Sequence, residues 1–526
     1  MRSVVNAFSP WTVGSHLSFH RKEILNESSS SSSNTSGIAG SDASSGDVVI
    51  ATAKESAKTN WLSVYLVVVI QFFAGFNFSI YLVTTWPFFS QIDPNAMEWF
   101  FGLIIAAYSV GQGLSSNVYG WLLNRFHKVR MLIVAGLCLN ILGSGMFATA
   151  QDWPVEEIRY VLLGSRVIIG VGFGTAGVLR SYLASATPLK DRSRAVALGT
   201  FGFFAGLTLG PAAQIAFHPL GFPGWVPLPF LNVNMYTGAG YFCMLTSLTG
   251  ILLLLTLFKE GNAGLVDDTT RRERFFALPK FDVLACVILL WVWFCLFVVQ
   301  VSGEAMNAPV LGVFYYLNHA EQIFYTSLLM TAAAFVSCWT FCAMAFTRFG
   351  KTDQRFLILF GCSLFVLFYL VTIPYPFYTG TLKYENATLR DGAGCLPHNE
   401  WCRHVPQLPW FIYASAYVLS YGVGVPLVMS STITLYSKII GPRRQGVMQA
   451  FLLQSGCVAR LTAPIVATLL FNWYGVTPPW LIMAAMNAIA LTLILLFFRR
   501  LVPLNTAPKL GPGEFYRFKK GFVYRF

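Results

Sequence analysis

Long apolar runs constrain this chain more than any other feature of its sequence. A helix needs about 20 consecutive apolar residues to cross the hydrocarbon core of a bilayer. Twelve runs of this kind are present, and the residues do not alternate in polarity as the strands of a membrane barrel do. The pattern therefore predicts an all-α membrane protein with twelve spanning helices. The runs cover residues 61–89, 99–123, 129–150, 160–182, 195–217, 235–258, 283–306, 321–346, 356–374, 409–435, 445–471 and 480–498.

Charged residues are few and unevenly placed. Of the 526 residues, 55% are hydrophobic and 11% are charged, whereas a soluble domain carries about 25% charged residues. Loops on one side of the predicted membrane hold seventeen Lys and Arg residues, and loops on the other side hold four. Because basic loops stay in the cytosol, this bias predicts cytosolic N- and C-termini. Topology and the lipid bilayer then account for the formal charge of +13, so nucleic acid is not an expected partner.

The basic loops recur at matched places in the two halves of the chain. Arg125 and Lys128 follow the second run, and Arg348 and Lys351 follow the eighth. A six-helix unit repeated in parallel is the layout of a two-bundle transporter, whose substrate path lies between the bundles near mid-membrane. The predicted segments are a disordered cytosolic tail at 1–60, a first bundle at 61–258, a cytosolic linker at 259–282, a second bundle at 283–498 with a lumenal loop at 375–408, and a basic cytosolic tail at 499–526.

Three short motifs resemble those of a known family. "GWLLNRFHKVR" (120–130) resembles the signature loop of the major facilitator superfamily, although that signature has Asp where Asn124 stands and Gly where His127 stands. "RVIIGVG" (166–172) and "GLTLGP" (206–211) resemble two further motifs of the same superfamily. The resemblance implies a twelve-helix major facilitator fold with two pseudo-symmetric six-helix bundles.

A narrower resemblance covers roughly residues 61–500. "FNFSIYLVTTWPFFSQIDPNA" (76–96), "NVNMYT" (232–237) and "GCLPHNEWC" (394–402) are similar to strings of the lysosomal major facilitator family linked to late-infantile neuronal ceroid lipofuscinosis. This resemblance implies a lysosomal or late endosomal membrane protein that handles an anion, with chloride-channel activity described for the family. The Ser-rich leader before residue 61 is where a signal for the sorting machinery would lie.

The matched loops predict a cytosolic gate that holds the two bundles together. A simpler interpretation is that cytosolic loops gather Lys and Arg in any membrane protein. The neutral Asn124 also departs from the charged version of the signature loop. The candidate gate residues are Gly120, Asn124, Arg125, Lys128, Arg130, Arg348 and Lys351.

Charged side chains within the runs are the strongest candidates for the substrate path. A charge at the bilayer centre costs about 2.5–3.5 kcal/mol on insertion scales, so it marks a functional site by default. Arg460 lies near the middle of the eleventh run and Arg166 lies in the fourth. Bracing of neighbouring helices is the alternative for Arg166. Arg180, near the cytosolic end of the fourth run, is expected to extend to the membrane surface.

Glu304, late in the seventh run, is the acidic member of this set. It is predicted either to pair with Arg460 or to lie in the far mouth of the path, should the helix break at Gly303. Because Arg166 and Arg460 outnumber it, the central charge favours anions over cations. Asn77 is a further candidate pathway residue, although Asn more often bridges helices.

The loop at 375–408 carries two predicted modifications. Cys395 and Cys402 would meet an oxidising lumen there and are expected to form a disulfide, with two free thiols as the alternative. Asn386-Ala-Thr388 is an acceptor for N-glycosylation on the lumenal side, whereas Asn34-Thr-Ser36 lies in the cytosolic tail and should stay unmodified.

The sequence thus predicts a transporter that moves a small anion by alternating access. Neither a phosphate-binding loop nor a nucleophile elbow nor a zinc-protease His pair is found, so no enzyme activity, metal or cofactor is expected. The expected partners are the lipid bilayer and a small anionic solute. Two alternatives stay open: a chloride-channel-like conductance on the same fold, and a membrane scaffold that does not transport.

Overall fold

The computed structural model describes residues 59–93, 98–228, 231–261, 281–317, 319–378, 380–382, 394–395, 400–403, 405–504, 515–518 and 521–524. The α-helices are α2 (Trp61–Ile92), α3 (Glu98–Phe126), α4 (Val129–Ala148), α5 (Val155–Phe173), α6 (Ala176–Ala186), α7 (Leu189–Phe217), α8 (Thr237–Thr256), α10 (Val283–Tyr315), α11 (His319–Phe346), α12 (Gln354–Val371), α13 (Trp410–Leu419), α14 (Val425–Ile440), α15 (Gly446–Tyr474) and α16 (Thr477–Leu496). A π-helix, η5 (Ser420–Gly424), joins α13 to α14, and short 3₁₀ segments are η1 (Ala150–Asp152), η2 (His218–Leu220), η3 (Arg348–Lys351) and η4 (Glu400–Arg403).

The strands are short and form three antiparallel hairpins. β1 (Trp225–Leu228) pairs with β2 (Leu231–Val233), β3 (Gly380–Thr381) pairs with β4 (Pro406–Gln407), and β5 (Phe515–Phe518) pairs with β6 (Gly521–Tyr524). None of these described strands belongs to the helical core, so the protein is all-α in its membrane part.

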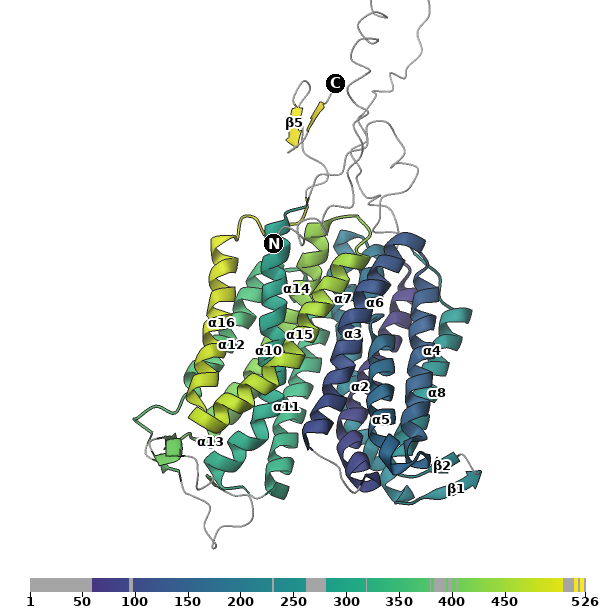
Figure 1. The fold of residues 1–526 in the computed structure, drawn as a ribbon. Helices are drawn as coiled ribbons and strands as arrows, with labels where there is room; N and C mark the ends of the chain where they lie inside the picture. The colour runs from purple at the N-terminus through teal and green to yellow at the C-terminus, as the bar shows by residue number, and fades with distance from the viewer. Residues whose placement is uncertain are drawn as a thin grey trace, which may run out of the picture. The chain divides into compact units, whose positions relative to one another are not determined.

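Twelve helical rods are present in the described residues when α5–α6 and α13–η5–α14 each count as one (Figure 1). They form two groups: the first group is α2 to α8 and the second group is α10 to α16. Within the first group α2 packs on α7, and α5 packs on α3 and α4; within the second group α10 packs on α15, and α12 packs on α16. The predicted twelve-helix membrane fold is confirmed.

Ten of the described rods are long and apolar enough to cross a membrane by length and composition. The other two, α3 and α7, are each 29 residues long but more polar. In α3 the polar side chains contact other helices: the hydroxyl of Ser115 donates to the carbonyl of Val171 at 3.1 Å, and the amide of Asn117 donates to Gln454 at 2.8 Å. Polar groups that bond between helices in this way need not face lipid.

Local sequence fixes many of the helix ends. The side chains of Asn60 and Asp282 cap the first backbone N–H groups of α2 and α10. Asp353 caps α12, and hydrogen bonds from Arg355 hold the pKa of that carboxyl below its ordinary value. At the other ends, Gly441 and Gly475 have positive φ angles of 80° and 81° and terminate α14 and α15.

A break at Gly303 was the condition for placing Glu304 in the far mouth of the path, and the helix does not break there. α10 continues through Gly303, Glu304 and Pro309 to Tyr315. Gly303 instead leaves room for a neighbour, since a Cβ there would overlap the hydroxyl of Tyr421 from η5. The irregular segments lie between α5 and α6 and at η5, and a π-helical turn of this kind is frequent at functional sites.

Glycines bring α2 and α7 into close contact. A Cβ at Gly206 of α7 would overlap the carbonyl oxygen of Phe72, and a Cβ at Gly75 of α2 would overlap that of Phe203. The backbones of the two helices therefore touch at these points, as small residues allow in membrane proteins.

Gly206→Ala should destabilise the protein, because overpacking at a backbone contact costs about 1–3 kcal/mol. Gly102→Ala is the matched control, since no atom lies within 4 Å of its Cβ position on α3. Removing a helical glycine there should be neutral or stabilising. Thermal unfolding of the detergent-solubilised protein, followed by intrinsic fluorescence, measures both effects. Equal midpoints for the two variants would contradict the proposed contact between α2 and α7.

Candidate functional site

The two groups of helices are held together at the end that carries the basic loops, which we name the basic end. There the side-chain oxygen of Asn124, on α3, accepts a hydrogen bond of 3.1 Å from the backbone N–H of Gly446. Gly446 is the first residue of α15, so Asn124 caps the N-terminus of a helix from the other group. Gly120 lies against the same turn, since a Cβ there would be 2.7 Å from the carbonyl oxygen of Gly446. The signature loop thus contacts the second group directly.

Two residues outside the predicted set of gate residues complete this contact. The guanidinium of Arg192, on α7, donates to the carbonyl of Ser437 at 3.3 Å, and its side chain is only 1% exposed. The hydroxyl of Ser193 donates to the carbonyl of Gly350 at 2.5 Å. Both belong to the segment 187–195, which also carries the basic residues Lys190 and Arg194. We call Gly120, Asn124, Arg192 and Ser193, with their partners, the basic-end latch.

The remaining predicted gate residues are not part of the latch in this structure. Arg130 contacts its own group: its backbone N–H donates to Glu260 at 2.9 Å and its guanidinium donates to the carbonyl of Phe258. Four others are exposed and make no hydrogen bond or ion pair within the described part of the chain, namely Arg125, Lys128, Arg348 and Lys351. Here the simpler interpretation of a basic cytosolic loop fits better.

Arg460 lies between the two groups, halfway along α15. Its guanidinium donates to the side-chain oxygen of Gln112, on α3, and to the sulfur of Cys457 at 3.3 Å. The Cζ atom is 5.3 Å from the ring centre of Phe297 and 6.0 Å from that of Phe78. The side chain is partly exposed, and no carboxylate among the described residues bonds to it.

Glu304 lies on α10 with its side chain exposed, and it accepts a hydrogen bond of 3.4 Å from Gln300. It interacts electrostatically with Arg460 and with Tyr417, although no direct ion pair joins these described residues. Arg460 and Glu304 are therefore close enough to influence each other electrostatically, but no direct contact between them neutralises either charge.

Arg180 does not extend to the membrane surface, and that expectation is wrong. It crosses to the second group instead, where its Cζ atom lies 4.9 Å from the ring centre of Trp293 on α10. It is also close enough to Arg460 for the two cations to repel each other. The sequence indicated how deep Arg180 lies along its helix, but it did not indicate the direction in which the side chain points.

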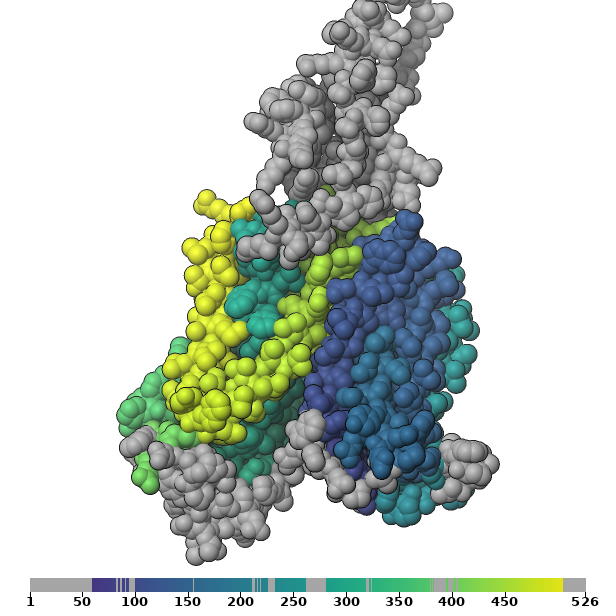
Figure 2. Space-filling view, viewed as in Figure 1, coloured from purple at the N-terminus to yellow at the C-terminus, as the bar shows by residue number. Residues whose placement is uncertain are grey.

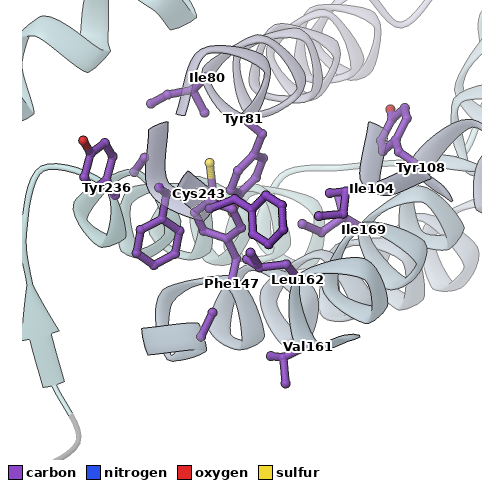
Figure 3. Close-up of a cluster of buried hydrophobic side chains, with 14 of the residues drawn as sticks. Ile80, Tyr81, Ile104, Tyr108, Phe147, Val161, Leu162, Ile169, Tyr236 and Cys243 are labelled. Carbon is purple, nitrogen blue, oxygen red and sulfur yellow. The ribbon is translucent and has the colours of Figure 1, made fainter. Parts of the chain in front are cut away.

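Arg166 is buried inside the first group, with 1% of its surface exposed. Its Cζ atom lies 5.2 Å from the ring centre of Tyr81 and 5.3 Å from that of Tyr108. These rings belong to the hydrophobic cluster around Phe147 that Figure 3 shows. No nitrogen of the guanidinium has a hydrogen-bond partner among the described residues. Arg166 and Arg460 both lie near enough to Tyr108 to influence it electrostatically.

Asn77 is also inside the first group. Its side-chain oxygen accepts a hydrogen bond of 3.0 Å from the hydroxyl of Thr246, which joins α2 to α8. The side chain borders a cavity of about 20 Å³ that Asn140 and Thr175 also line. A space of that size holds about one water molecule, so the helix-bridging alternative describes Asn77 in this structure.

Of the two features predicted for the loop at 375–408, the described residues show one. Cys395 and Cys402 are joined in a disulfide, with 6.5 Å between their Cα atoms. Asn386 lies outside the described residues. Among the residues that are described, no three His, Cys, Asp or Glu side chains gather as a metal site.

Two six-helix groups that meet over a charged centre, and that are joined by a latch at one end, define a multi-pass membrane transporter of the two-bundle class. The chain belongs to the major facilitator superfamily, because the family model of that name matches residues 67–452. The resemblance of the sequence motifs is thereby confirmed. The family and fold are those of transporters rather than enzymes.

Individual relatives agree with this assignment. Major facilitator superfamily domain-containing protein 8 from Xenopus laevis is 26% identical over 484 residues, which cover 86% of this chain and 94% of that protein. Among solved structures, the proton:xylose symporter XylE has a TM-score of 0.64 at 14% identity and covers 83% of this chain and 95% of its own. The human organic anion transporter MFSD10 (TETRAN) has a TM-score of 0.57 at 16% identity, covering 82% and 99%. These two structures share the fold of this chain.

Asn124→Asp should close the basic end more tightly. A carboxylate beside the N-terminus of α15 adds about 0.3–1 kcal/mol of charge–dipole attraction that an amide lacks, which is about a two- to fivefold shift in population. Asn124→Ala removes the acceptor and should open that end. Spin labels at Lys128→Cys and Lys351→Cys, in a background without other accessible thiols, report the distance between the groups by double electron–electron resonance. Identical distance distributions in both variants would argue against the latch.

Proposed function

We propose that this protein moves a small anion, either chloride or an organic anion, across a lysosomal or late endosomal membrane by alternating access. The observation that carries the proposal is the partly exposed guanidinium of Arg460 between the two groups of helices. Arg180 adds a second cation to the same neighbourhood, and Glu304 supplies one carboxylate. A centre with this surplus of positive charge attracts anions and repels cations.

Alternating access is supported by where the groups touch. The hydrogen bonds of Asn124, Arg192 and Ser193 join them at the basic end, and those of Asn117 and Gln112 join them toward the middle of α3. Toward the opposite end, the coloured surfaces of the two groups diverge in Figure 2. Rocking about the middle would break the latch and close the opposite end. A latch of this kind favours a carrier over a continuously open channel.

The anion class and the membrane are supported by similarity. A protein named as an organic anion transporter shares the fold. The sequence resemblance to the lysosomal major facilitator family supports the endolysosomal location. The positive loops at the basic end support an orientation with that end, and both termini, in the cytosol.

Arg460→Gln should lower anion flux more than tenfold, because a hydrogen bond to a charged group contributes about 1.5–3 kcal/mol. Uptake of radiolabelled chloride and acetate into proteoliposomes measures the effect. Arg348→Gln is the matched control, since the side chain of this Arg is exposed and makes no hydrogen bond or ion pair with a described residue. Normal flux in Arg460→Gln protein that reconstitutes in normal amounts would remove Arg460 from the pathway.

The proposed orientation has its own test. Asn386→Gln should abolish the shift in gel mobility that a peptide N-glycosidase produces, because Asn386 faces the lumen in this orientation. Asn34→Gln is the control and should change nothing, because Asn34 lies in the cytosolic tail. Glycan on Asn34 in place of Asn386 would reverse the assignment of the two sides.

A further inference from the structure

Two guanidinium groups with unused hydrogen-bond donors converge from opposite groups of helices. Nη1 of Arg180, on α6, is buried and has no hydrogen-bond partner among the described residues, and the same is true of Nε of Arg460, on α15. A buried donor without an acceptor costs about 1–3 kcal/mol, so such donors usually serve a ligand or water. Neither Arg has a carboxylate bonded to it within the described part of the chain.

Two neighbouring rings of α10 hold these groups in place. Trp293 and Phe297 are one helical turn apart, and their ring centres are 5.2 Å from each other. Arg180 lies 4.9 Å from the first ring and Arg460 lies 5.3 Å from the second. Arg460 also donates to the sulfur of Cys457, one turn away on its own helix. The two cations therefore share one aromatic surface.

Like charges held together in a membrane need an anion between them. Their mutual repulsion, added to the cost of removing each cation from water, disfavours the empty pair. The carboxylate of Glu304 interacts with Arg460 but is exposed and forms no ion pair with it. One carboxylate also leaves one of the two positive charges uncompensated.

We propose that Arg180 and Arg460 together bind an anion that presents two oxygen atoms, such as a carboxylate or a phosphate, one guanidinium on each oxygen. This inference rests on the proposed function and specifies its substrate class. Guanidinium groups are planar forks whose paired donors match two acceptor oxygens, whereas a halide offers one spherical acceptor.

The test is ligand-induced stabilisation of the purified full-length protein. Thermal unfolding is followed while sodium acetate, sodium phosphate or sodium chloride is titrated at constant ionic strength, because a ligand that binds the folded state raises the midpoint by an amount that grows with ln(1 + [L]/Kd). We expect acetate or phosphate to give the same rise in midpoint as chloride at a concentration at least tenfold lower. Comparing acetate with phosphate distinguishes a carboxylate from a phosphate ligand.

Three variants make the test specific to the pair. Arg180→Gln should weaken binding of the oxygen-bearing anion at least tenfold. Arg180→Lys, which keeps the charge but loses the fork, should weaken it several-fold while chloride binding is unchanged. Arg348→Gln should bind as the unaltered protein does. Size-exclusion chromatography verifies that each variant is folded before titration.

The outcomes separate this inference from the function on which it rests. Chloride binding as tight as that of both acetate and phosphate, or undiminished acetate and phosphate binding in Arg180→Gln, would overturn the paired site. If chloride alone stabilises the protein, and that effect is lost in Arg460→Gln but not in Arg180→Gln, the proposed anion function stands and the pair fails. If no anion stabilises the protein, both are wrong.

Discussion

The cost of a charge in hydrocarbon determines how this molecule arranges its arginines. Arg166, Arg180, Arg192 and Arg460 all turn toward other helices, and no carboxylate pairs with any of them among the described residues. Aromatic rings, amide oxygens and backbone carbonyls contact them instead. Such partners reduce the cost of burial without cancelling the charge. A chain that keeps unneutralised cations at its centre retains an electrostatic potential there, and the proposed anion path depends on that potential.

The fold could be predicted from the sequence because insertion into a membrane depends on the length and hydrophobicity of each segment. Each apolar run meets this requirement independently of the other runs, so the twelve helices and their approximate ends follow from the lengths of the runs. The basic-end contacts were partly predictable, since Asn124 and Gly120 stand in a signature loop. The residue that this loop contacts was not predictable, because Gly446 lies 322 residues away from Asn124 and has no side chain.

The destinations of individual side chains escaped sequence reasoning for a geometric reason. Position along a run gives depth in the membrane, but the direction of a side chain around the helix depends on which neighbours pack there. The depth of Arg180 predicted that its side chain reaches the membrane surface, yet the side chain lies over the ring of Trp293 from the other group. Asn77 was chosen as a mid-membrane polar residue, yet Thr246 uses its oxygen to join two helices. No sequence pattern predicted the π-helix at Ser420–Gly424.

The placement of Arg180 and Arg460 on opposite groups connects binding to motion. With the basic end joined, as it is here, Arg180 lies near enough to Arg460 for the two cations to repel each other, and this repulsion opposes the joined arrangement when nothing lies between them. The neutral Asn124 adds only an amide hydrogen bond to the latch, without the attraction that a carboxylate would exert on the N-terminus of α15. An anion bound between the two cations would remove the repulsion and favour closure, so occupancy of the centre would set which end of the transporter is open.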